Sequence, residues 1–163
     1  MINLRTELGQ IRAIKDDYNI LSRIKNPSTR VQRVAVSVNG MALKYINNPT
    51  KDMLNEAIEN NPLCIKYWEN QTDDTCLNAV RLNGLALEFV KNKTSKICCE
   101  AILNNGQAIK FVPKKTEELF LIAFNRDKNI INSLKNYYPS LAKHLIRKYP
   151  KTILYVNTTV DTF

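Results

Sequence analysis

Four cysteines and one histidine are the side chains best suited to metal or nucleophilic chemistry in this chain. They are Cys64, Cys76, Cys98, Cys99 and His144. A tetrahedral zinc site needs several Cys and His ligands at short, regular spacing, because four ligand atoms must converge on one ion. No C-x-x-C pair is present, so the spacing argues against such a site. We predict instead that most of the cysteines are small buried hydrophobic residues.

The sequence also lacks the patterns that are typical of enzyme active sites. Glycine-rich phosphate loops and the nucleophile elbow of hydrolases are both absent. His144 has no evident acid-base partner, and we expect it to face solvent. The pairs Asp73-Asp74 and Glu117-Glu118 fall where helices should begin, and the helix dipole favours negative charge there. We therefore predict a protein that is not an enzyme and binds no metal or cofactor.

The charge balance indicates binding. The chain has 163 residues, with 24 Lys and Arg against 15 Asp and Glu, which gives a net charge of +9. A basic surface suits nucleic acid, an acidic protein face or a membrane surface, and solubility alone also explains an excess of lysine. No apolar run approaches the roughly 20 residues of a membrane-spanning helix, and the N-terminus lacks a secretory signal pattern. We expect a cytoplasmic protein with no membrane partner and no small-molecule ligand.

The elements that carry these residues follow from a short repeat, with a period of about 22 residues. Three markers share its register: a hydroxyl residue, an alanine seven residues later, and an Asn or Asp four residues after the alanine. Their agreement over six copies indicates a repeat architecture. The hydroxyl residues are Thr6, Ser28, Thr50, Thr72, Thr94 and Thr116, the alanines are Ala13, Ala35, Ala57, Ala79, Ala101 and Ala123, and the third marker is Asp17, Asn39, Asn61, Asn83, Asn105 and Asp127.

Each unit has the features of a helical hairpin. The hydroxyl residue should cap a helix, and apolar residues at unit positions 4, 5, 8 and 9 form one helical face. An Asn-Gly pair should end that helix, with the glycine in the left-handed conformation. A second, shorter helix then carries a recurrent aromatic residue, which we expect in the core, while the alanines should lie where helices approach most closely. These aromatic residues are Tyr45, Tyr67, Phe89 and Phe111.

Stacking of these hairpins predicts the fold. Asn-Gly could also mark a β-hairpin, but the apolar spacing on both sides fits a helical period better. One hairpin cannot bury its own apolar face, so neighbouring units must share a core. We predict an all-α fold, an α-solenoid of about seven 22-residue helical hairpins that forms a single domain over residues 1–163. The units are about 6–27, 28–49, 50–71, 72–93, 94–115, 116–137 and 138–159, and the terminal units are irregular, as capping units are.

Two stretches resemble a known repeat. They are Asn83-Gly-Leu-Ala-Leu-Glu-Phe-Val90 and Asn105-Gly-Gln-Ala-Ile-Lys-Phe-Val112. Both are similar to a short α-helical repeat family of unknown function that occurs in large DNA viruses, phages, bacteria and protists, and the resemblance covers about residues 28–137. It implies a helical repeat fold, and it implies no catalytic residue and no cofactor. The abundance of Asn, Ile and Lys is a bias of AT-rich genomes, which fits a phage or viral source.

A lysine stripe is the first candidate binding surface. In the repeat register, Lys44, Lys66 and Lys110 share one position on the second helix, and Glu88 occupies it in the fourth unit. Stacking should align them along one face, where they could follow a phosphate backbone. The same stripe also fits a solvated lysine face without a binding role. Further basic candidates, strongest at the C-terminal end, are Lys114, Lys135, Arg147 and Lys148.

Leucines that depart from the repeat are the second candidate surface. Leu82 and Leu121 are the main candidates, since other units have polar residues at such positions. An exposed apolar patch on the first-helix layer would suit a protein contact, unless this layer is packed more deeply than expected. Related residues are Leu77, Leu103 and Ile122.

We conclude from the sequence that a non-enzymatic protein-binding module is favoured. The preferred form is a phage or viral protein that binds and modulates a host factor. The alternative is a nucleic-acid-binding protein that uses the basic stripe. Lack of the paired polar residues that read bases in repeat proteins weighs against this alternative.

Overall fold

The structure, a computed structural model, describes residues 4–151, apart from the side chains of residues 133, 134, 136 and 137. Every secondary-structure element in this range is a helix, so the all-α prediction is confirmed there. Each of the first five units pairs an α-helix with a 3₁₀-helix. The pairs are α1 (Glu7–Asp16) and η1 (Tyr18–Arg23), α2 (Thr29–Val38) and η2 (Gly40–Tyr45), α3 (Lys51–Asn60) and η3 (Pro62–Tyr67), α4 (Asp73–Leu82) and η4 (Gly84–Phe89), and α5 (Ser95–Asn104) and η5 (Gly106–Phe111).

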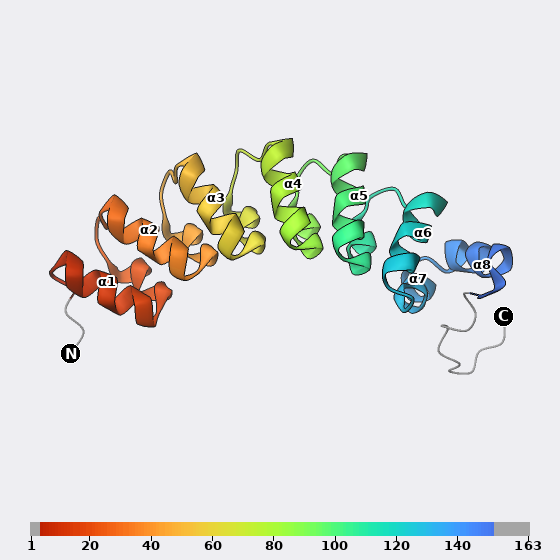
Figure 1. The fold of residues 1–163 in the computed structure, drawn as a ribbon, viewed down its shortest axis with the longest axis horizontal. Coiled ribbons are helices and arrows are strands. Elements are labelled where there is room, and N and C mark those ends of the chain that lie inside the picture. Colours follow the sequence, from red (N-terminus) through yellow and green to blue (C-terminus); the bar gives the residue numbers. More distant parts are fainter. Residues whose placement is uncertain (1–3, 152–163) are drawn as a thin grey trace.

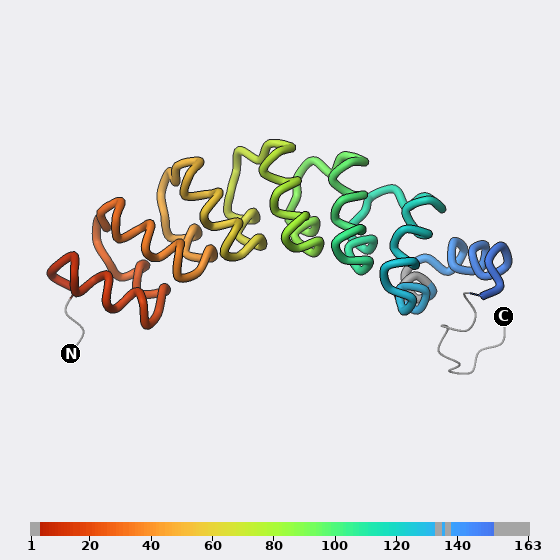
Figure 2. The backbone as a smooth tube through the Cα atoms, in the orientation of Figure 1, coloured from red at the N-terminus to blue at the C-terminus, as the bar shows by residue number. Residues whose placement is uncertain are grey.

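The units follow one another along an arched row, with α1 at one end of the arch and α8 at the other (Figure 1). Each α-helix from α1 to α5 packs beside the α-helix of the next unit, and η1–η5 form a parallel second row. The smooth backbone trace shows the same step repeated from unit to unit (Figure 2). Equivalent residues of successive units therefore lie in rows along the molecule.

The far end of the row departs from the repeat. After α6 (Glu117–Arg126), the second helix is an α-helix, α7 (Ile130–Tyr137), and it packs against η5 and α6. The next helix, α8 (Pro139–Lys148), begins with a proline and has no side-chain cap at Tyr138. The rest of the predicted seventh unit, from residue 152 on, lies outside the described residues.

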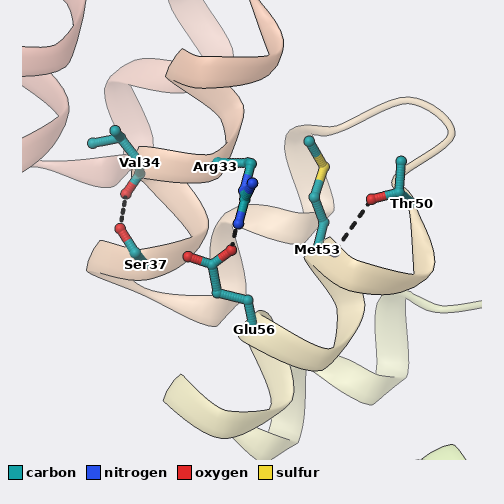
Figure 3. A network of polar contacts seen from close by, with 6 residues as sticks. All are labelled: Arg33, Val34, Ser37, Thr50, Met53 and Glu56. Carbon is teal, nitrogen blue, oxygen red and sulfur yellow. Dashed lines mark hydrogen bonds and ion pairs between the residues drawn. The ribbon is translucent and has the colours of Figure 1, made fainter.

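The hydroxyl residues cap the α-helices, as predicted. Thr50 Oγ1 accepts a hydrogen bond of 3.2 Å from the Met53 N–H at the start of α3 (Figure 3). This satisfies one of the backbone donors that have no partner within the helix. The same contact is made in the other copies of the marker, by Thr6, Ser28, Thr72, Thr94 and Thr116.

The prediction of left-handed glycine at the helix ends is wrong. No glycine in the described residues has a positive φ angle. The α-helix ends at the preceding Asn, which is extended, and the glycine is required by close packing instead. A Cβ atom on Gly40 would overlap the carbonyl oxygen of Ala57 in the next unit, and one on Gly106 would lie 2.8 Å from the Ala123 oxygen. The predicted close approach at the alanines is thus confirmed, and it is an approach of backbone to backbone.

The second helix, a 3₁₀-helix, begins directly where the α-helix stops, because one Asn side chain caps it there. Asn39 N–H donates to Ala35 O at 3.0 Å and ends α2. Its Oδ1 accepts from Met41 N–H at 2.9 Å and caps η2. No linker is needed between the two helices, which is how both fit into one short unit. Asp17, Asn61, Asn83 and Asn105 repeat this arrangement.

The core lies between the two rows of helices and is continuous along the described chain. Met53, Leu54, Ala57 and Ile58 of α3 are all buried, as the helical spacing predicted. Cys64, Cys76 and Cys98 are buried too, and Cys99 is half-buried. Burial raises the pKa of the Cys64 thiol to about 12, so it remains a neutral apolar group at physiological pH. These three cysteines are structural, in line with the sequence prediction.

Candidate protein-binding surface

A row of charged side chains runs along the 3₁₀-helices. Lys44 on η2, Lys66 on η3 and Lys110 on η5 are exposed at equivalent positions, and Glu88 on η4 is exposed between the last two. The 3₁₀-helices that carry them pack side by side. The predicted alignment of these residues therefore follows from the stacking, with one carboxylate interrupting the lysines.

The recurrent aromatic residues border this surface, and their prediction as core is confirmed only in part: they pack against the core without being fully buried. Tyr45, Tyr67 and Phe111 are only partly buried, as is Phe89. They lie at the outer edge of the core because a 3₁₀-helix turns by about 120° per residue, which brings the residue after the exposed lysine to the margin. An aromatic ring and a cation thus alternate along one face.

The lysines lie over these rings. The Nζ atoms of Lys44, Lys66 and Lys110 are 4.5, 4.8 and 4.9 Å from the ring centroids of the next residue in the chain. A cation over an aromatic face gains about 0.5–1 kcal/mol at an exposed site. The hydrogen bond with Tyr45 raises the pKa of Lys44, so this lysine stays charged well above neutral pH.

Two of the lysines also reach an aromatic ring of an adjacent unit. Lys66 Nζ lies 5.4 Å from the Phe89 ring of the fourth unit, and Lys44 Nζ lies 5.8 Å from the Tyr18 ring of the first. The cations therefore bridge successive units. We call this surface the lysine–aromatic face, and it consists of Tyr18, Lys44, Tyr45, Lys66, Tyr67, Glu88, Phe89, Lys110 and Phe111.

Grooves open beside this face at successive unit boundaries. One, of about 520 Å³, is lined by Tyr45 and by the loop that contains Asn26 of the first unit. The next, of about 730 Å³, is lined by Tyr67 and by the loop that contains Asn48 of the second unit. Asn26 and Asn48 both adopt left-handed backbone conformations, with φ of 52° and 54°. The two grooves are related by one step of the repeat. Grooves as well as charged side chains therefore recur from unit to unit on this surface.

The other predicted basic residues do not join this face as one site. Lys114 and Arg147 are exposed, and Lys135 is half-buried on α7. Lys148 on α8 is engaged by Glu117, with 2.6 Å between Nζ and Oε1. Lys148 thus has a structural partner, and its assignment to a binding surface stays a prediction.

Glu117 on α6 contacts several side chains at the C-terminal end of the row, where α6 meets α8. Besides Lys148, it accepts a hydrogen bond of 2.6 Å from the Tyr149 hydroxyl, and His144 Nε2 lies 3.7 Å from its Oε2. The hydrogen bond from Lys148, followed by that from Tyr149, lowers the pKa of Glu117 to about 2. The His144 ring is exposed, as predicted, but it faces this carboxylate. The cluster fastens α8 to α6, which is a structural role.

The predicted leucine patch is divided by the structure. Leu82 and Leu103 are 50% and 53% exposed. Leu121 and Ile122 are half-buried and pack against the core, and Leu77 is buried. The prediction that Leu121 is exposed is thus corrected, and at the equivalent position of the fourth unit Leu77 is buried more deeply still.

An asparagine contact between units was missed by sequence reasoning and explains Leu82. Asn104 at the end of α5 accepts from Gly84 N–H at 2.7 Å and donates to Arg81 O at 2.7 Å, both in the preceding unit. Asn60 makes the same two contacts to the second unit. Leu82 holds the equivalent position in the fourth unit, where the third unit has Pro62, which has no N–H to donate. The signal was the joint change of Gly to Pro and of Asn to Leu.

The α-helical layer has its own contacts between units. Arg33 on α2 reaches Glu56 on α3, with 3.4 Å between Nε and Oε2 (Figure 3). Arg81 on α4 contacts Glu100 on α5 through two hydrogen bonds of 3.2 and 3.0 Å. Exposed pairs of this kind contribute about 0–1 kcal/mol each, so they support the stacking only modestly.

Comparisons with protein-family models, curated proteins and solved structures found no match. The resemblance to the short helical repeat therefore stays a prediction. Within the described residues no group of His, Cys, Asp and Glu is placed to hold a metal ion. No helix among those residues is both long enough and apolar enough to cross a bilayer.

Proposed function

We propose that this chain is a non-enzymatic protein-binding module that holds an acidic partner on the lysine–aromatic face. The observation that carries the proposal is the row formed by Lys44, Lys66 and Lys110, each of which lies over a partly exposed aromatic ring. Cations attract an acidic segment, and the ring edges offer it apolar contact. Aromatic residues are also enriched in the parts of protein interfaces that contribute most to affinity. As the sequence favoured, the partner would be a host factor bound by a phage or viral protein.

Glu88 favours a protein over a nucleic acid as the partner. A polynucleotide presents a uniform line of phosphates, and a carboxylate in the middle of the lysine row would repel it. The rings of Tyr45 and Tyr67 have lysine ammonium groups over them, which hinders the stacking of bases. A protein segment can place a basic or neutral residue opposite Glu88. Nucleic-acid binding remains the alternative, and the experiment must distinguish it from protein binding.

A peptide-display selection against the immobilised protein tests the proposal. We expect enriched peptides to be acidic and to contain apolar residues. Their binding should weaken at least about fivefold in Lys44→Glu and in Lys66→Glu, since each change removes an attraction and adds a repulsion. Lys51→Glu is the matched control, because Lys51 is exposed at the start of α3, in the other row of helices.

Two results would contradict the proposal. One is a set of enriched peptides that bind the Lys44 and Lys66 variants as well as the unchanged protein. The other is a mobility shift of RNA or DNA oligonucleotides at about 50 mM salt that disappears in those variants, which would support the nucleic-acid alternative.

A further inference from the structure

The charge order along the lysine–aromatic face is specific enough to define its ligand. From the second unit to the fifth it is positive, positive, negative, positive, through Lys44, Lys66, Glu88 and Lys110. All four side chains are exposed. A ligand with complementary charges would read acidic, acidic, basic, acidic in the same order. The grooves beside Tyr45 and Tyr67 recur at the same period and offer both apolar and polar contacts.

The step of the repeat matches the length of three residues of extended peptide. Packed helices lie about 8–10 Å apart, and a peptide in the extended polyproline II conformation advances about 3.1 Å per residue with three residues per turn. Every third side chain of such a segment points to the same side, so each of these side chains would meet one unit. A helical ligand advances only about 1.5 Å per residue and would need about six or seven residues per unit. An extended ligand therefore meets each unit with far fewer residues and can place a charge at every one.

We propose, building on the proposed function, that the lysine–aromatic face binds a peptide segment in the extended polyproline II conformation with charged residues at every third position. Three of the four are acidic and meet Lys44, Lys66 and Lys110, and one basic residue meets Glu88. Depending on the direction of the peptide, the pattern is E-x-x-E-x-x-K-x-x-E or E-x-x-K-x-x-E-x-x-E. The residues between them lie over the aromatic rings and the loops that contain Asn26 and Asn48.

The test compares four synthetic peptides of identical composition by fluorescence anisotropy. Two carry the lysine at one of the internal charged positions, as in the patterns above, and two carry it at either end. Each terminal-lysine peptide places one lysine opposite a cation and one glutamate opposite Glu88. We expect the better internal-lysine peptide to bind at least about fivefold more tightly than both terminal-lysine peptides.

Glu88→Lys supplies the complementary variant. It makes the row uniformly positive, so the variant should prefer a peptide with glutamate at all four positions and lose its preference for the internal lysine. Glu88 is exposed on η4, and a helical circular-dichroism spectrum checks that the variant folds. If the unchanged protein prefers the internal-lysine peptide and Glu88→Lys prefers the all-glutamate peptide, the charge order determines which peptide binds.

The outcomes separate this inference from the proposed function. Equal binding of all four peptides, lost in Lys44→Glu, would overturn the charge register and leave the binding face in place. Absence of binding by all four would overturn the extended-peptide ligand, while the display selection would still decide whether the face binds protein. Tight binding of both terminal-lysine peptides alone would contradict the alignment of the row.

Discussion

Single asparagines determine much of this repeat at the residue scale. Asn39 ends α2 with its backbone and starts η2 with its side chain, so that two helices share one cap. Asn104 holds one unit to the next by pairing Gly84 N–H and Arg81 O. An amide side chain suits both roles because it carries a donor group and an acceptor on one short arm. These two asparagine positions of the repeat therefore have structural roles.

Asn104→Ala should destabilise the protein by about 1–3 kcal/mol, because it leaves the N–H of buried Gly84 without its partner. The free energy of unfolding from urea titration measures this cost. Leu82→Ala is the matched control at the same unit position, where Pro62 offers no N–H, and it should cost much less. Equal costs for the two substitutions would show that the asparagine contact adds nothing to stability.

At the scale of elements, the regular units and the C-terminal end are held by different means. Units one to five have a capped α-helix and a 3₁₀-helix, with close backbone contact at Gly40, Gly84 and Gly106. The end of the row uses the α-helices α7 and α8, and α8 has no side-chain cap. There the Glu117 cluster joins α6 to α8 through Lys148 and Tyr149. The attachment of α8 therefore depends on charge as well as on the burial of Ala142 and Leu145.

Glu117→Gln should lower the melting temperature at neutral pH. The carboxylate has its pKa lowered to about 2 in the folded protein, from an ordinary value near 4.5. Its contribution to stability is therefore fully present above about pH 4.5 and is lost as the pH falls toward 2. The difference between the variant and the unchanged protein in thermal unfolding should shrink over that range.

Glu118→Gln controls for the loss of one negative charge in the same helix turn, and it should change the melting temperature little. A difference for Glu117→Gln that stays constant from pH 7 to pH 2 would contradict the proposed role of its ionised form.

The elements also show what the sequence can and cannot predict. The threonine caps, the buried face of α3 and the close approach at the alanines follow from local chemistry and spacing. The 3₁₀ geometry of the second helix was missed, because one unit of the repeat accommodates two short helices of either kind. That geometry in turn places Tyr45 and Tyr67 at the outer edge of the core rather than within it. The partner of Lys148 could not be predicted, since Glu117 lies in the preceding unit and only the fold brings the two side chains together.

At the scale of the whole molecule, a net charge of +9 is distributed unevenly. In the α-helical layer, arginines contact acidic residues of neighbouring units. Along the 3₁₀-helices, the lysines of the lysine–aromatic face lie over aromatic rings rather than beside carboxylates. Excess positive charge on one periodic face steers an acidic partner toward it and speeds association.

Chemical-shift mapping of the ¹⁵N-labelled protein, titrated with the most enriched peptide from the display selection, tests the binding face most directly. We expect the backbone amides of η2, η3 and η5, around Lys44, Lys66 and Lys110, to shift most, and those of the α-helical layer to shift little. Shifts concentrated around Leu82 and Leu103, with the 3₁₀-helices unaffected, would contradict the central claim.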